Sequence, residues 1–157
     1  MKNKLVAYFS ASGVTAHLAA HLAEAVDADL HEIKPLVPYS DADLNWNDAH
    51  SRSSVEMKDK TSRPAIANHV EHMEGYDTIY IGFPIWWYTA PTIIHTFLEQ
   101  YDLNGKTIIP FATSGGSAMG ATNQDLAPSC PGAILKEGKR WNADASLTTL
   151  KNWAEQL

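Results

Sequence analysis

Cysteine is almost absent from this sequence: Cys130 is the single one among 157 residues. An internal disulfide is therefore impossible, and we expect a reducing, cytoplasmic environment. Cys130 has no cationic neighbour in the sequence, whereas reactive thiols need an electropositive setting. We therefore interpret this thiol as incidental to function.

Long apolar runs are missing as well. None approaches the roughly 18 residues that a membrane-spanning helix needs. The N-terminus leads into a strand, without the basic start, apolar stretch and cleavage site of a signal peptide. We expect neither a membrane segment nor a signal peptide. The hydrophobic content of 45% still provides a sizeable core, and we expect one domain over residues 1–157.

Basic residues are scarce, with 12 Lys and Arg against 18 Asp and Glu and a formal net charge of −6. Nucleic-acid binding needs clustered Lys and Arg, so we expect no nucleic-acid partner. An acidic surface instead suits docking to basic protein partners. Any bound phosphate has to be held by amides and hydroxyls.

Three common ligand-binding motifs are incomplete. The dinucleotide fingerprint G-x-G-x-x-G has only Gly13 after the first strand. A Walker A loop would need a glycine five residues before Gly105, where Gln100 stands. His17 and His21 have the spacing of a metal-ligand pair, but no third ligand is suggested, so a solvated helix face is the better interpretation.

The first loop joins a buried strand to a helix. Residues 5–9 are apolar almost continuously, as in a parallel strand covered on both faces, and residues 15–26 have helical spacing. Such a loop aims backbone N–H groups at one point, where the helix dipole adds partial positive charge. We interpret it as a phosphate cradle; the alternative is an ordinary N-cap containing serines. Its residues are Ser10, Ser12, Gly13, Val14 and Thr15.

The second loop follows a predicted strand at residues 77–83 and holds three adjacent large aromatics. Aromatic side chains normally belong to the core, but at the carboxyl end of a strand they can form a platform for a planar ligand. We favour the ligand interpretation. The loop consists of Pro84, Ile85, Trp86, Trp87 and Tyr88.

The third loop follows a predicted strand at residues 106–112 and is rich in glycine and hydroxyls. Such a loop lets the backbone approach a ligand with its N–H groups free to donate. Its residues are Thr113, Ser114, Gly115, Gly116 and Ser117.

The other segments have weaker signals. We expect a second, edge strand at 29–33, a helix beginning at 62–64 that turns Ile66, Val70 and Met73 inward, and a helix from 89–91 to about 101. Further helices are expected at 117–127 and after a cap at Asp144, with a weak fifth strand at 133–135. Residues 34–62 are irregular, which usually means function or a local extra helix.

Strands alternating with helices imply a doubly wound parallel sheet with right-handed crossovers, which binds ligands at the carboxyl ends of its strands. All three loops fall at that edge. A phosphate nest, an aromatic platform and a row of amides describe a ligand with a phosphate at one end and a flat heterocycle at the other. Flavin mononucleotide (FMN) meets this description.

The motifs also carry a family resemblance. Residues 8–15 (YFSASGVT), 82–87 (GFPIWW), 90–91 (AP) and 111–117 (FATSGGS) resemble the bacterial flavodoxin family, in particular its compact flavodoxin-like branch, over nearly the whole chain. The resemblance implies an α/β flavodoxin-like fold. It would have a five-stranded parallel sheet in the order 2-1-3-4-5, helices on both faces and noncovalent FMN.

By that match, the first loop would hold the phosphate. Pro84, Trp86, Trp87 and Tyr88 would flank the isoalloxazine, and residues 113–116 would contact its pyrimidine side or the ribityl chain. Val14 replaces the asparagine usual in flavodoxins, which could weaken phosphate binding by roughly 0.5–1.5 kcal/mol. Tyr88 follows the Trp pair, where many relatives place glycine near flavin N5.

These observations favour a low-potential electron carrier in which FMN does the chemistry and the protein supplies no acid, base or nucleophile. Its partners would be a flavodoxin reductase and redox proteins, and it would be a monomer or weak dimer. The alternative is an FMN-dependent NAD(P)H oxidoreductase acting on quinones, with residues 34–62, including Trp46 and Arg52, as a lid or dimer contact. A third possibility is a flavodoxin-like scaffold that has lost its cofactor and serves as a binding module.

Overall fold

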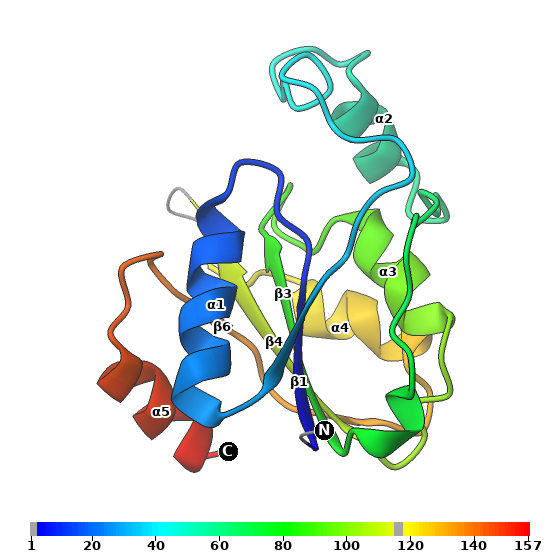
Figure 1. Cartoon of the computed structure of the whole chain (residues 1–157). Helices are drawn as coiled ribbons and strands as arrows, with labels where there is room; N and C mark the ends of the chain where they lie inside the picture. Colours follow the sequence, from blue (N-terminus) through cyan, green and yellow to red (C-terminus); the bar gives the residue numbers. More distant parts are fainter. Residues whose placement is uncertain (1–2, 115–117) are drawn as a thin grey trace.

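A parallel sheet forms the centre of the computed structural model, which describes residues 3–114 and 118–157 (Figure 1). Its five main strands lie in the order β2-β1-β3-β4-β5, so the expected topology is confirmed. The bounds of these strands are β1 Lys4–Tyr8, β2 Asp29–Glu32, β3 Thr78–Pro84, β4 Thr107–Thr113 and β5 Ile134–Leu135.

A sixth strand, β6 (Lys139–Arg140), was not expected from the sequence. It also pairs with β4, beyond the point where β5 ends. The carbonyls of Ile108 and Ala112 accept hydrogen bonds on this side of β4, so Pro110 between them faces the same side. Proline has no N–H to donate, and the ladder is interrupted there. After β5 the chain moves away from this edge of β4, and it pairs with the same edge again as β6.

Helices cover both faces of the sheet, as expected (Figure 1). On one face, α1 (Val14–Val26) and α5 (Leu147–Glu155) bury Leu18, Leu22 and Leu150 with Val6 and Tyr80 of the sheet. On the other face, α3 (Thr92–Glu99) and α4 (Thr122–Leu126) bury Ile93, Phe97 and Leu126 with the alternate strand residues Leu5, Ile79 and Ile81. The alternation of strand side chains produces these two separate clusters.

The helix predicted to begin at residues 62–64 is wrong. This segment pairs with residues 34–36 instead: Pro35 and Ile66 form an antiparallel bridge, Leu36 N–H donates to Ala65 O (2.8 Å) and Ala67 N–H donates to Lys34 O (2.7 Å). Only a 3-10 turn, η1 (Met73–Gly75), follows. Pairing with a distant segment has overridden the local helical spacing.

Two other helix predictions need correction. Ser146, not Asp144, caps α5, since its Oγ accepts from Thr149 N–H at 3.1 Å. The helix expected over 117–127 is shorter: α4 ends at Leu126 and a 3-10 turn, η2 (Ala127–Ser129), follows. The irregular segment does contain an extra helix, α2 (Arg52–Lys58). In the described ranges no helix is long and apolar enough to cross a membrane.

Candidate ligand site at the carboxyl edge of the sheet

The three loops that the sequence singles out meet at one edge of the sheet. Thr15 Oγ1 lies 2.7 Å from Thr113 Oγ1, which joins the first loop to the third. Ile85 N–H donates to Thr113 O at 2.8 Å, which joins the second loop to the third. The Trp86 ring meets the Phe9 ring edge-on at 5.6 Å, next to the first loop. Gly115, Gly116 and Ser117 lie outside the described residues.

The first loop leaves the amino end of α1 without a side-chain cap. Gly13 occupies the N-cap position in the left-handed region (φ 92°), and its N–H donates to Ser10 Oγ at 3.0 Å. The first intrahelical bond runs from His17 N–H to Gly13 O (3.1 Å), so the amides at positions 14–16 have no partner in the described part of the chain. An ordinary serine N-cap is therefore wrong, and the free amides suit an anion.

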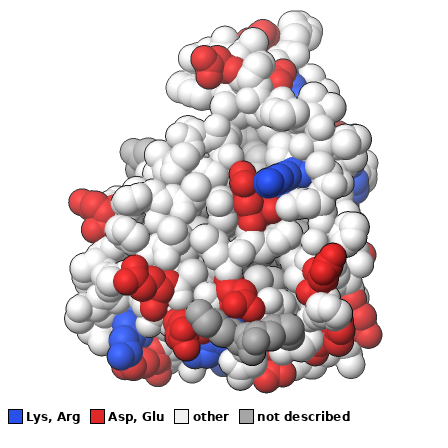
Figure 2. Space-filling model, in the orientation of Figure 1, with Lys and Arg blue, Asp and Glu red and all other residues white. Residues whose placement is uncertain are grey.

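The surroundings of this loop also fit a phosphate. Apart from its chain neighbours, no residue in the ranges 3–114 and 118–157 lies within 4 Å of the point where a Cβ on Gly13 would be, so these ranges leave the loop open on that side. Figure 2 shows that the surface near the amino end of α1 is largely uncharged in this view, while acidic side chains collect toward the other end of the sheet. Amides and hydroxyls would bind the anion there, since the loop has no Lys or Arg.

The second loop divides its aromatic residues between core and surface. Trp86 is partly buried against the core, whereas Trp87 and Tyr88 expose 45% and 69% of their surface. Two backbone hydrogen bonds join Trp86 and Thr89, so Trp87 and Tyr88 are the central residues of a two-residue turn. Both have positive φ (49° and 63°), which such a turn requires and which Gly or Asn adopts most easily.

This strained turn is held from the side of α4. The Tyr88 carbonyl accepts from Ala121 N–H at 3.0 Å, and a Cβ on Gly120 would lie 2.2 Å from Tyr88 O. Gly120 is therefore the residue that lets the two segments touch. Non-glycine residues in left-handed backbone collect at functional sites, where the surrounding structure fixes them.

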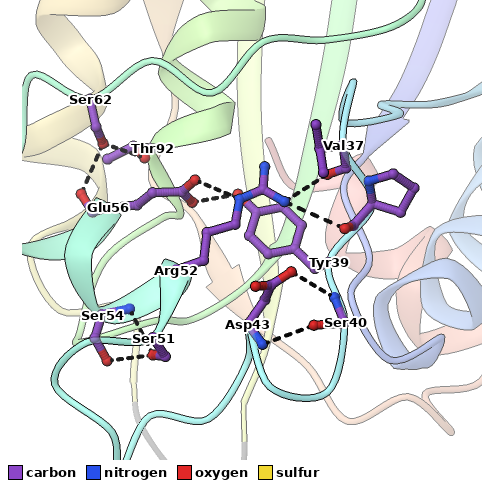
Figure 3. Close-up of polar contacts among 11 residues, drawn as sticks. Val37, Tyr39, Ser40, Asp43, Ser51, Arg52, Ser54, Glu56, Ser62 and Thr92 are labelled. Carbon is purple, nitrogen blue, oxygen red and sulfur yellow. Dashed lines mark hydrogen bonds and ion pairs between the residues drawn. The ribbon is translucent and has the colours of Figure 1, made fainter.

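The irregular segment is anchored to the same edge through Tyr39. Its ring meets Phe9 at 5.4 Å and Trp86 at 5.6 Å. The Arg52 guanidinium lies 3.8 Å above the Tyr39 ring, while Arg52 Nε–H donates to Glu56 Oε2 at 3.0 Å and an Nη1–H donates to Val37 O at 2.7 Å (Figure 3). The Tyr39 hydroxyl donates to Glu56. Burial, followed by this hydrogen bond, raises the pKa of Tyr39 above its ordinary range.

Sequence analysis did not name Tyr39 as a site residue, although it is one of only two aromatic residues in the polar, irregular segment 34–62, and that scarcity was a usable signal. The sequence named Arg52, with Trp46, as part of a possible lid or dimer contact, and in the structure Arg52 contacts Tyr39, Glu56 and Val37 of the same segment. Trp46 is 71% exposed. The part of the segment around α2 projects beyond the sheet (Figure 1).

Cys130 and the His17–His21 pair are the remaining candidate residues. Cys130 is buried, and burial raises the pKa of its thiol, which makes the reactive thiolate less accessible. The rings of His17 and His21 on α1 lie with their centroids 4.4 Å apart and their planes tilted by 52°. Among the described residues, no three His, Cys, Asp or Glu side chains are grouped so as to hold a metal ion.

The fold and this edge define a flavodoxin-like α/β protein. A sequence model of the flavodoxin family matches residues 3–157. The chain therefore belongs to the flavodoxin family.

Known structures and sequences agree with this assignment. A candidate flavoprotein from Bacteroides uniformis superimposes with a TM-score of 0.92 at 51% identity, over 98% of this chain and 97% of that one. A Lactobacillus acidophilus flavoprotein solved in complex with FMN gives a TM-score of 0.71 at 25% identity, over 89% of this chain and 93% of that one.

A curated relative is an enzyme. FMN-dependent NADH:quinone oxidoreductase 1 of Bacillus subtilis is 26% identical over 135 residues, which are 82% of this chain. The chain spans only 61% of the length of that relative. Together with the FMN complex, this relative confirms FMN as a cofactor of flavodoxin-like proteins similar to this chain.

Proposed function

We propose that this chain binds one FMN at the carboxyl edge of the sheet and carries electrons between a flavodoxin reductase and a redox protein. The contact between Thr15 and Thr113 is the observation that carries the proposal. It brings an uncapped helix terminus next to the strand end that also holds the aromatic loop. A phosphate and a flat ring of one molecule can therefore be bound together.

The roles of individual residues follow from their positions. The free amides of Val14 and Thr15, with the hydroxyls of Ser10 and Ser12 and the open backbone of Gly13, would bind the phosphate. The exposed rings of Trp87 and Tyr88 would contact the isoalloxazine. Pro84, Ile85 and Trp86 would support them from the core side, and Thr113, Ser114, Gly115 and Gly116 would contact the pyrimidine side or the ribityl chain.

The flavin supplies the redox chemistry when it is bound, and the chain supplies its environment. Aromatic rings exclude water from one side of the slot. Negative surface charge disfavours additional negative charge at the site and favours docking of basic partner proteins. A cytoplasmic location is proposed with these partners.

An absorbance spectrum and a fluorescence titration with FMN test the binding. We expect a yellow protein, or a colourless one that takes up one FMN and quenches its fluorescence. Val14→Asn restores the side chain usual in flavodoxins, and we expect it to tighten FMN binding by about 2–10-fold. A protein that takes up no FMN would refute the proposal and favour a scaffold without cofactor.

A second candidate function is direct oxidation of NAD(P)H by an FMN enzyme, with a quinone as acceptor. The relative from Bacillus subtilis favours it. Turnover of NADH or NADPH with a quinone, in the absence of a separate reductase, would support the enzyme. Turnover at the rate of free FMN would leave the electron carrier as the function.

A further inference from the structure

A second concave site lies on the α3–α4 side of the Trp87–Tyr88 turn. It is a cavity of about 370 Å³ between α3, α4 and residues 57–63. The hydroxyls of Ser62 and Thr92 are hydrogen-bonded at 2.9 Å, which holds that segment against the start of α3 (Figure 3). The apolar part of its wall consists of Met57, Trp87, Tyr88, Ala90, Ala121 and Pro128. Its volume is within the range typical of small-molecule sites.

The charged groups in the wall are balanced. Lys60 and Arg63 are opposed by Glu99 and Asp125. Arg63 Nε–H and Nη2–H donate to the two carboxylate oxygens of Glu99 at 2.8 and 3.0 Å. Thr89 Oγ1–H donates to Asp125 Oδ2 at 2.7 Å. Because the charges cancel, the cavity has no preference for an anion or a cation, and a neutral ligand suits it.

A hydrogen-bond relay runs within this wall from the partly exposed Glu99 through the buried Ser129 to His95. Ser129 Oγ–H donates to Glu99 Oε2 at 2.8 Å, which uses its single proton. The 2.6 Å contact between His95 Nδ1 and Ser129 Oγ is then a hydrogen bond donated by Nδ1–H. Burial, and secondly Arg63, lower the pKa of His95, so the ring is neutral at pH 7. Its Nε2 is left as an acceptor.

This acceptor is unused by the part of the chain that the structure describes. His95 exposes only 9% of its surface and belongs to the cavity wall. Nε2 has no hydrogen-bond partner among the described residues, and it is absent from the atoms there that are both unpartnered and completely buried. Nε2 is therefore not completely buried, and its residue lines the cavity. A ligand hydroxyl that reaches this atom would replace solvent there and give the acceptor a fixed partner.

We propose that this cavity binds a small, flat, neutral aromatic molecule of the phenol class, whose hydroxyl donates to His95 Nε2. The rings of Trp87 and Tyr88 would contact the aromatic part of the ligand. The inference goes beyond the proposed function, because the relay that defines it involves none of the residues assigned to FMN. The two sites share only the Trp87–Tyr88 turn, which would separate the ligand from the flavin.

Calorimetry with two probes tests the donor requirement. The protein as purified, in buffer without free FMN, is titrated with 2-naphthol and with 2-methoxynaphthalene, which has the same rings but no hydroxyl donor. We expect saturable binding of 2-naphthol and affinity about tenfold lower for the methyl ether. Equal affinity for both probes, or no saturable binding of 2-naphthol, would overturn the proposal.

His95→Asn removes Nε2 but keeps an N–H that can donate to Ser129, so the relay is preserved. We expect it to weaken 2-naphthol binding about tenfold and to leave binding of the methyl ether unchanged. In the wild type, the ¹⁵N resonance of His95 Nε2 should move with 2-naphthol and stay in place with 2-methoxynaphthalene. A stationary resonance, or an unchanged affinity in a folded His95→Asn variant, contradicts the assignment.

Ala121→Phe fills the cavity from an exposed position and should abolish binding of both probes while FMN uptake persists. Probe binding that survives this change places the ligand elsewhere and refutes the site. An FMN titration of each preparation separates the two proposals. Uptake of FMN without 2-naphthol refutes only the cavity, and uptake of 2-naphthol without FMN refutes only the flavin site.

Discussion

Thr15 Oγ1 and Thr113 Oγ1 lie 2.7 Å apart, and both residues are buried. One hydroxyl belongs to the first turn of α1 and the other to the last residue of β4. The bond fixes the helix terminus against the strand end that leads into the third loop. The two halves of the candidate site are thus joined by side chains that are not available to solvent.

Thr113→Val removes this bond and keeps the side-chain shape. We expect the free energy of unfolding to fall by about 1–2 kcal/mol, because the Thr15 hydroxyl loses its partner in a buried place. Urea unfolding measures the change. Thr107→Val, at the other end of β4, is the matched control, since its hydroxyl has no hydrogen-bond partner among the described residues. Equal losses in both variants would show that the bond does not stabilise the edge.

Tyr88→Asn tests the strained turn. Asparagine tolerates the left-handed backbone that Tyr88 adopts, so the flavin-free protein should gain up to about 1 kcal/mol of stability. FMN affinity should fall about tenfold if the ring contacts the isoalloxazine. Thermal unfolding without FMN and a fluorescence titration with FMN measure the two effects. Tyr88→Phe keeps the ring, so unchanged affinity in Tyr88→Asn relative to Tyr88→Phe would remove Tyr88 from the flavin site.

Sequence periodicity predicted a doubly wound parallel sheet and the edge that carries the three loops, while the family resemblance implied the strand order. These features depend on local patterns, because an apolar strand, a loop and a helical pattern recur along the chain. Right-handed parallel connections between such strands then allow few sheet topologies, and they place the loops after the strands at one edge. The segment around Ile66, for which a helix was predicted, pairs with the segment around Pro35 instead, and this pairing depends on residues far away in the sequence. The spacing of Ile66, Val70 and Met73 fits a helix equally well, and only the distant partner decides.

The parts of the site that sequence reasoning missed come from residues that are far apart in the chain. Tyr39 lies next to Phe9 and Trp86 only because the irregular segment returns to the sheet edge. His95, Glu99 and Ser129 form a relay across two helical segments, and none of the three has an unusual sequence neighbourhood. Contacts of this kind depend on tertiary packing, which no short pattern encodes.

Tyr76 provides a prediction for alkaline pH. Its hydroxyl donates to Asp29 Oδ2 at 2.7 Å, and burial, followed by this bond, raises the pKa of Tyr76 to about 12. An unfolded tyrosine ionises near pH 10, about 2 units lower. Between these values the unfolded state has lost a proton that the native state keeps. Stability therefore falls as the pH rises, by up to about 1.4 kcal/mol per pH unit for one proton.

Tyr76→Phe should remove this contribution. Urea unfolding at about pH 9 and about pH 11 gives the slope for each protein, and we expect a smaller loss in the variant than in the wild type. Tyr88→Phe is the control, because the hydroxyl it removes belongs to an exposed side chain. The same slope in the wild type and in Tyr76→Phe would mean that the Asp29 bond does not hold the proton.

Arg52→Lys tests whether the irregular segment supports the aromatic loop. Lysine cannot cover the Tyr39 ring while also donating to Glu56 and Val37 as the planar guanidinium does. We expect amide exchange in peptides from residues 36–62 to accelerate, with a global loss below about 1 kcal/mol because the ion pair is partly exposed. Hydrogen-exchange mass spectrometry measures this, with peptides from α1 as the internal reference.

Arg140→Lys is the matched control, since Arg140 bonds only to Asn142 among the described side chains. The Arg52 variant should also weaken FMN binding by a few-fold, because Tyr39 packs against Trp86 and its loosening frees the aromatic loop. Faster exchange with unchanged FMN affinity would show that the segment moves independently of the flavin slot. Unchanged exchange would show that Tyr39 holds the segment without the guanidinium.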